Sequence, residues 1–233
     1  MRWLVLRLHA PLASFGGTAI DAKGVTRDFP AASAITGLLS NALGYERHEA
    51  DRLDRLQARL VFGGERGEEP PLGRMTDFQT AKLGANDKGW TTRGRIEERA
   101  GGAATYASPH IRYRDYHADT RMSVVLPPAP ADEPPTPDDI AAALDRPARP
   151  LFFGRKSCLP ANYLLAPGDD RWIEAQDARA ALAALPGAHA MRALWPAAPD
   201  EGREVADRRN WRSGLHGGTR RVTEGWIVPA GQS

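Results

Sequence analysis

Residues 2–44 constrain the fold more than any other part of the chain, because three recognisable patterns follow one another there without a break. Residues 3–8 are mainly large or β-branched apolar residues and Pro11 ends the run, so a buried strand is expected. Residues 14–28 are polar and contain Gly, and apolar residues then recur at helical spacing as far as Gly44. The sequence therefore predicts a strand, a loop and an amphipathic helix in that order.

The junction between this loop and the helix is a candidate anion site. A helix N-terminus presents backbone N–H groups and the positive end of the helix dipole, and a Gly-containing loop can add further donors. Gly16, Lys23 and Arg27 lie in the loop, and Ser33 falls in the first turn of the expected helix. Many α/β proteins begin with the same three elements for structural reasons, so the pattern alone leaves both interpretations open.

The order of the following elements indicates an α+β protein. Helical spacing recurs over residues 48–60, and Thr136 is a candidate N-cap for a helix that continues through Leu144. Strands are expected at residues 60–64, 74–80 and 110–126. The order of strand, helix, strand, long insert, two strands and helix suits a ferredoxin-like, RRM-related sheet with two helices on one face.

The long insert, residues 81–109, shows no periodicity and is rich in Gly, Asn, Asp, Thr and Arg. A segment of this length inside a compact domain is usually functional or disordered. Trp90 stands near Arg93 and Arg95, and such a group can stack a base and follow a phosphate backbone. We expect an inserted thumb that contacts RNA. The alternative is a solvated loop whose Trp packs locally.

Residues 1–150 are expected to form the ferredoxin-like domain, and residues 151–233 a basic Gly loop followed by a small β-rich lobe. The loop combines flexible backbone, two cations and a hydroxyl in Gly154, Arg155, Lys156 and Ser157. It lacks the spacing of a nucleotide P-loop, so on residues alone it is an ordinary surface turn.

The C-terminal lobe is expected to contain a helix at residues 177–185 and strands at residues 203–209 and 220–228. The last strand is expected to pack Val222, Trp226 and Val228 into the lobe. A cluster of arginines marks the lobe, namely Arg208, Arg209, Arg212, Arg220 and Arg221. This cluster is either a surface patch that binds RNA or a partner protein, or simply the solvated tip of a hairpin.

Composition limits the function classes. The formal net charge is +2, with 31 Lys+Arg against 29 Asp+Glu, so any affinity for nucleic acid must come from local clusters. The single cysteine, Cys158, excludes an internal disulfide framework, fits a reducing cytoplasm and is expected to be a buried structural residue rather than a reactive thiol. No apolar run is long enough to span a bilayer and no cleavable leader is visible, so a cytoplasmic location is expected.

Catalytic signatures are absent from the sequence. The six histidines are scattered without the spacing of a metal site, and neither a nucleophile elbow nor a Walker motif occurs, so no metal or cofactor is expected. The enzymatic alternative is metal-independent RNA cleavage, which needs a base for a 2′-OH proton and an acid for the leaving oxygen. Tyr45, Lys88 and His117 are candidates for that set, although no spacing supports it.

Several blocks resemble, in the same order, the CasD family of RNA-binding proteins. The opening blocks are Leu6-Arg7-Leu8 with Pro11, Ser14-Phe15-Gly16, Phe29-Pro30 with Ser33, and Gly37-Leu38-Leu39 with Leu43-Gly44. The later blocks are Asp77-Phe78-Gln79-Thr80, Arg114 with Tyr116-His117 and Asp119, and Gly154-Arg155-Lys156-Ser157-Cys158 after Pro150-Leu151. Asp28 and Ala32 depart from the family, which often has basic residues at these two positions.

The resemblance implies a non-catalytic subunit of the type I-E CRISPR surveillance complex, Cascade, that holds the 5′ handle of the CRISPR RNA and caps the backbone filament. Its partners would be the backbone subunit CasC and the large subunit CasA, in a hetero-oligomer. The expected RNA-binding residues are Phe15, Gly16, Lys23, Arg27, Ser33, Trp90, Arg93, Arg95, Arg114, Gly154, Arg155, Lys156 and Ser157. Cleavage of repeat RNA, as in type I-C relatives, is the alternative function.

Overall fold

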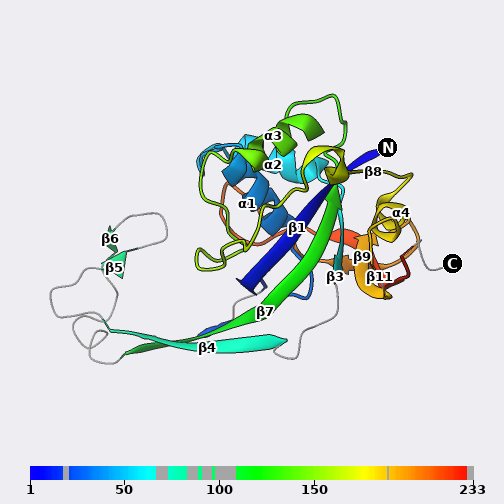
Figure 1. Cartoon of the computed structure of the whole chain (residues 1–233). Helices are drawn as coiled ribbons and strands as arrows, with labels where there is room; N and C mark the ends of the chain where they lie inside the picture. The colour runs from blue at the N-terminus through cyan, green and yellow to red at the C-terminus, as the bar shows by residue number, and fades with distance from the viewer. Residues whose placement is uncertain are drawn as a thin grey trace.

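A computed structural model of the chain describes residues 1–17, 21–66, 73–82, 89–90, 96–97, 109–187 and 189–229. Its centre is a large, almost entirely antiparallel sheet with the strand order β10-β11-β9-β3-β7-β1-β8 (Figure 1). These strands are β1 (Arg2–Ala13), β3 (Gly63–Arg66), β7 (His110–Leu126), β8 (Trp172–Glu174), β9 (Met191–Pro196), β10 (Arg203–Val205) and β11 (Arg220–Ile227). The two longest strands, β1 and β7, pair from Leu4↔Leu126 to Ala13↔His117.

Three helices, α1 (Ala32–Ala42), α2 (Ala50–Arg59) and α3 (Pro137–Asp145), cover one face of this sheet. Alternate residues of a strand point to the same face, so Leu4, Leu6 and Leu8 of β1 all face these helices. They form one core with Ile35 and Leu39 of α1, all at most 2% exposed. The predicted strand and amphipathic helix at the start of the chain are therefore confirmed.

A smaller core lies on the opposite face. There α4 (Ala178–Ala183) packs Leu182 against Trp3 and Val5 of β1 and Val125 of β7. This helix covers only part of its face, because the residues that follow Val5 on the same side of β1 are Arg7 and His9, which are less buried. The sheet is thus covered by three helices on one side and partly open on the other.

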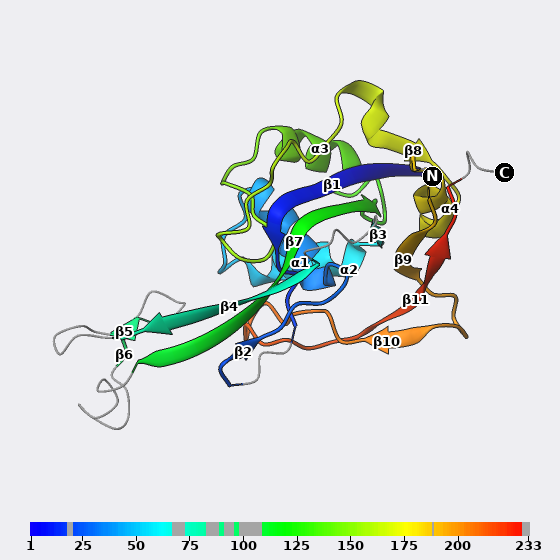
Figure 2. The same cartoon turned by 60° about the horizontal axis from the view of Figure 1, so that its bottom comes forward.

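A long arm projects from this body (Figures 1 and 2). It is formed by β4 (Arg74–Ala81), which pairs with the first half of β7 from Arg74↔His117 to Ala81↔His110. The short strand β2 (Lys23–Gly24) runs parallel to β7 at the base of the arm. The expected insert follows β4, and its described residues form the small pair β5 (Gly89–Trp90) and β6 (Ile96–Glu97).

The α+β, ferredoxin-like fold with an inserted thumb is confirmed, but one detail of the C-terminal lobe is wrong. Val222 is buried, whereas Trp226 and Val228 are 69% and 58% exposed. Val222 and Trp226 share a face of β11 and Val228 follows its end, but Phe29 packs on that face only near Val222, and Ile227 is buried on the other side. The C-terminal strands join the central sheet through the pairing of β9 with β3. The expected domain boundary near residue 150 stays a prediction.

Candidate nucleic-acid interface

A cleft of about 620 Å³ lies where the end of β1, the base of the arm, α1 and the basic Gly loop meet. Segments from distant parts of the sequence form its walls. The residues expected to bind RNA that line it are Phe15, Gly16, Ser33, Arg114, Gly154 and Arg155. The fold therefore brings together the first loop, the start of the helix and the basic Gly loop, as the resemblance implied.

Gly154 brings the basic loop against the end of β1. Its φ of +88° lies in the left-handed region, and an added Cβ would stand 1.6 Å from the carbonyl oxygen of Ser14. The Ser14 N–H donates to the Phe153 carbonyl at 3.0 Å, which joins the two segments. Only glycine combines this conformation with so close an approach, so the loop is fixed rather than flexible at this point.

Arg155 is held by the base of the arm. Its Nη1 donates to the carbonyl of Asp115 at 3.0 Å and its Nη2 to the carbonyl of Gly24 at 2.9 Å, while the guanidinium lies 4.5 Å from the centre of the Tyr116 ring. Two carbonyl acceptors do not neutralise the cation. Arg155 thus links β2 and β7 and places a positive charge in the wall of the cleft.

The cleft is strongly basic. Among the described residues, the arginines that line it are Arg47, Arg114, Arg149, Arg155 and Arg209, and the one acidic residue is Glu46, which pairs with Arg149. A concave surface of one sign of charge attracts the opposite charge, so the cleft favours a polyanion. Because the net charge of the chain is only +2, affinity for nucleic acid requires a local cluster of positive residues, and the arginines of the cleft form such a cluster.

Sequence reasoning missed two of these arginines. Arg149 donates to the carbonyls of Gly44 and Tyr45 at 3.2 and 2.9 Å, and so holds the segment after α1. Arg47 lies in that segment and lines the cleft. Neither stands in a recognisable motif, because they reach the cleft only through the packing of the α1–α2 connection against the chain after α3.

Arg209 connects the C-terminal lobe to the cleft. Its backbone exchanges two hydrogen bonds with Gln57 of α2, at 2.9 and 3.0 Å, and its guanidinium lies 5.3 Å from the Trp211 ring centre. Burial, and then the positive charge of Arg47, lower the pKa of Arg209 below its ordinary value. Because two cations stand close enough to oppose each other, an anion bound between them would be stabilised. The C-terminal arginine cluster therefore contributes one member to the cleft.

The helix N-terminus differs from the expected anion site. The N–H of Ala32 donates to the carboxylate of Asp207 at 3.1 Å, and the N–H of Ser33 donates to the Asp207 carbonyl at 3.0 Å. Arg220 completes the group with a 2.9 Å hydrogen bond to the same carboxylate, which is buried. These two amides are already used by a residue of the chain itself, so their expected role as phosphate donors is wrong, although Ser33 still lines the cleft.

Four other expected residues lie around the cleft rather than in its lining. Lys23 is exposed on β2, and Lys156 and Ser157 are exposed in the basic loop. Arg27 donates to the carbonyl of Ala206 at 2.7 Å, which ties the first loop to the C-terminal lobe. These placements leave the three exposed side chains accessible to RNA and give Arg27 a structural contact as well.

Phe15 is a core residue and not an accessible stacking surface. It is 2% exposed and its ring centre lies 5.4 Å from that of His117. Exposed aromatic residues instead occur on the arm, where the rings of Phe78 and Tyr113 lie 5.4 Å apart and are 56% and 40% exposed. The loop folds the Phe15 ring inward over β7, and a contact between Phe15 and RNA stays a prediction.

Three expected residues fall in the insert. Arg93 and Arg95 lie outside the described residues, and for Trp90 the structure gives only the backbone, in β5. Arg114 stands at the root of the arm, where its Nε donates to the side-chain oxygen of Gln79 at 2.8 Å. The described part of the arm thus carries a cation on one face and the exposed ring pair of Phe78 and Tyr113 on the other.

The residues considered for RNA cleavage differ in accessibility. His117 is 2% exposed, and its Nε2 donates to the carbonyl of Arg27 at 2.7 Å. Burial lowers the pKa of His117 from its ordinary value of 6.5. Tyr45 lines the cleft, with Arg52 stacked 3.8 Å from its ring centre, and Lys88 lies outside the described residues. His117 in this state is poorly placed to exchange a proton with a substrate in the cleft.

Other features of the described residues bear on the remaining expectations. Cys158 is fully buried and burial raises the pKa of its thiol, so the expected structural role of this cysteine is confirmed. Within the described ranges, no three His, Cys, Asp or Glu side chains are grouped to hold a metal ion. In the same part of the chain, no helix has the length and apolar character needed to cross a membrane.

Comparisons with known proteins agree with this picture. Residues 3–223 match the family model Cas_Cas5d, described as CRISPR-associated protein (Cas_Cas5), while curated proteins give no match. One similar solved structure, titled "CRISPR RNA-guided surveillance complex", has a TM-score of 0.71 at 22% identity and covers 98% of this chain and 92% of its own.

Another solved structure, titled "Crystal structure of Cas protein", has a TM-score of 0.63 at 24% identity, with 97% of this chain and 95% of the other covered. Identities at this level establish a shared fold, and the family match extends over nearly the whole chain. The strand, the basic Gly loop and the arm that form the cleft all lie within the matched residues. The chain therefore belongs to the Cas5 family of CRISPR-associated proteins.

Proposed function

We propose that this protein is a non-catalytic RNA-binding subunit of a type I-E CRISPR surveillance complex, in which it holds the 5′ handle of the CRISPR RNA. The observation that carries the proposal is the basic cleft at the foot of the arm, with five arginines against one glutamate in its described lining. Membership of the Cas5 family supports a role in a CRISPR system.

The mechanism is retention of the RNA by fixed cations. Arg155 and Arg149 are oriented by main-chain carbonyls, so they lose little conformational freedom when a phosphate binds. The planar guanidinium group can donate two parallel hydrogen bonds to one phosphate. Arg209, whose pKa is lowered by burial and then by the charge of Arg47, gains from a bound anion nearby. A bent, single-stranded RNA segment with closely spaced phosphates suits such a cleft.

The arm provides the second part of the proposed grip. Phe78 and Tyr113 offer exposed rings on which a base can stack, and Arg114 stands at the root of the arm in the cleft. We assign to the arm the role of a thumb between the handle and the adjacent backbone subunit CasC. CasA is the other proposed partner, and the complex would act in the cytoplasm.

RNA cleavage is the second candidate function, and the position of Tyr45 in the cleft is the observation that favours it. A general base must reach the proton that it removes, directly or through one water. His117 is buried, with its Nε2 bonded to a main-chain carbonyl, so it does not meet this condition. Retention of RNA therefore fits the described residues better than turnover.

The proposal is tested by the salt dependence of handle binding in the reconstituted complex. The double variant Arg114→Ala/Arg209→Ala removes two cations from the cleft, and Arg146→Ala removes an exposed cation outside it. For single-stranded RNA the slope of log K against log salt should fall by about 0.7 for each phosphate that is no longer neutralised, hence by about 1.4 in the double variant. An unchanged slope in the double variant, or an equal change in Arg146→Ala, would refute the assignment of the cleft.

A further inference from the structure

A second cavity, of about 670 Å³, lies on the α4 side of the sheet, opposite the face that α1, α2 and α3 cover. None of its lining residues lines the cleft. Its floor is formed by Val5, Glu65 and Ser123 on the neighbouring strands β1, β3 and β7. The proposed grip on the 5′ handle makes no use of this cavity.

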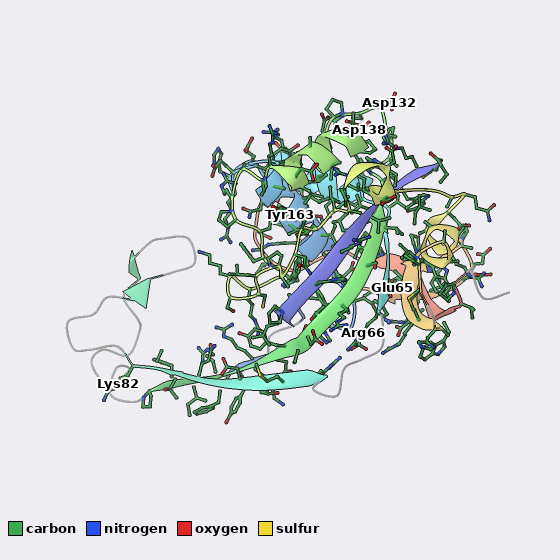
Figure 3. All side chains as sticks on the ribbon, viewed as in Figure 1. Glu65, Arg66, Lys82, Asp132, Asp138 and Tyr163 are labelled. Carbon is green, nitrogen blue, oxygen red and sulfur yellow. The ribbon has the colours of Figure 1, made fainter. Side chains whose placement is uncertain are left out.

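Glu65 is the most unusual residue of the floor. It stands on β3 between β7 and β9, and is only 6% exposed (Figure 3). Burial raises the pKa of Glu65, and hydrogen bonds with Ser123 offset only part of that rise. Its Oε2 has no hydrogen-bond partner among the described residues. A buried polar atom left without a partner usually destabilises a fold, so this one points to a hydrogen-bond donor supplied by a ligand.

Cations stand at the rim of the same cavity. Arg7 and His9 follow Val5 on one side of β1, and His9 lies opposite Arg121 of β7. Burial, followed by the charges of Arg7 and Arg121, lowers the pKa of His9. Arg121 has a 3.4 Å contact with the exposed Asp119, and Arg7 forms no ion pair within the described part of the chain. The rim therefore offers two arginines to an anionic group, with Asp170 the acidic residue of the wall.

The walls are apolar. Ile173 comes from β8, Leu185 and Pro186 come from the segment that follows α4, and Met191 comes from β9. A flat, uncharged group is the natural occupant of such walls.

We propose that this cavity binds one nucleotide, whose base donates an N–H group to Glu65 and whose phosphate pairs with Arg7 and Arg121. A carboxyl oxygen accepts from the amino groups of bases, and arginine suits phosphate. A simple anion leaves the Glu65 oxygen without a partner, and a simple cation is repelled by the two arginines. A nucleotide satisfies both ends and places its base between apolar walls. It can be a free nucleotide or one residue of a single-stranded RNA.

The test uses the full-length chain and the four nucleoside 5′-monophosphates, with binding followed by isothermal titration calorimetry. At least one monophosphate is expected to bind, and its nucleoside, which lacks the phosphate, should bind about tenfold more weakly or worse, the reduction expected for one charge-assisted hydrogen bond. Arg7→Ala changes an exposed residue and should weaken the monophosphate about tenfold. Glu65→Leu removes the acceptor without burying a new polar group and should abolish binding.

Arg146→Ala, an exposed arginine outside both cavities, is the matched control and should bind as the unmodified chain does. The proposal is overturned if no monophosphate binds at millimolar concentration, or if Arg7→Ala and Glu65→Leu both bind normally. It is also overturned if Arg114→Ala abolishes binding while Arg7→Ala does not, since the nucleotide then occupies the cleft. If a short single-stranded RNA competes with the monophosphate for the cavity, the natural occupant is a residue of RNA. If it does not compete, the occupant is a free nucleotide.

Discussion

Replacing Gly154 by Ala should destabilise the protein far more than replacing Gly16 by Ala, although both glycines have positive φ. At Gly16 an added Cβ meets nothing within 4 Å, so the cost is the left-handed backbone alone, about 1 kcal/mol. At Gly154 the same cost applies, and the Cβ would also stand 1.6 Å from the Ser14 carbonyl oxygen. The loop must therefore move away from the end of β1.

That movement has a calculable consequence. It breaks the Ser14–Phe153 hydrogen bond and displaces Arg155 from the carbonyls of Asp115 and Gly24, and each of these three bonds contributes about 1 kcal/mol or more. With the backbone cost, the total for Gly154→Ala is about 4 kcal/mol, a decrease of roughly 8–16 °C in Tm for a chain of this size, against roughly 2–4 °C for Gly16→Ala. Thermal unfolding of both variants measures the difference. Equal decreases would show that the close approach does not hold the basic loop.

Three further predictions follow from buried or exposed charges. Asp207→Asn should lower the free energy of unfolding, measured by denaturant titration, by about 3 kcal/mol or more, because it leaves the buried Arg220 without its counter-charge. Adding Arg220→Gln should restore part of the stability. If the double variant is no more stable than Asp207→Asn, the pairing is contradicted. The Tm should fall as pH drops below about 6.5, because the pKa of His117 is lowered in the folded protein and the unfolded chain therefore binds more protons. His117→Gln should reduce the dependence of Tm on pH, and His9, whose pKa is also lowered, should account for part of what remains. An unchanged pH dependence would show that His117 does not cause it. Lys156→Ala should weaken handle binding without changing the Tm, whereas Arg155→Ala should lower both, and a lower Tm in Lys156→Ala would count against its exposed position.

Local patterns predicted much of the fold because they depend on neighbours in sequence. The short run of large and β-branched apolar residues at positions 3–8 predicted the central strand. Thr136 caps α3 as expected, since its hydroxyl accepts from the Asp139 N–H at 3.2 Å and the Asp139 carboxylate accepts from the Thr136 N–H at 2.8 Å. Such features need no information about the rest of the chain.

The features that were missed depend on partners far away in sequence. β8 and β9 are short strands defined by pairing with β1, β3 and β11, and their own residues carry no periodic signal. The cap of α1 is Asp207, which no pattern near α1 indicates. This cap is why the expected phosphate donors at the helix N-terminus were wrong.

The candidate site was predictable only in part. Arg155 and Gly154 were found by the resemblance, and Arg209 was noticed only as part of a C-terminal cluster. Arg47 and Arg149 reach the cleft through the connections after α1 and α3, and their position became visible only when those connections were packed together. The burial of Phe15 could not be predicted, because an aromatic residue in a loop gives no sign of the direction of its ring.

The central claim is that the chain holds RNA in the basic cleft without cutting it. The most direct measurement incubates the full-length chain, and the complex that contains it but lacks any processing nuclease, with end-labelled repeat RNA, and then separates bound, free and cleaved RNA by electrophoresis. We expect intact RNA that is retained by the complex and is released when the complex carries Arg114→Ala/Arg209→Ala. Cleaved RNA that disappears in Tyr45→Phe or His117→Gln, with assembly preserved, would contradict it.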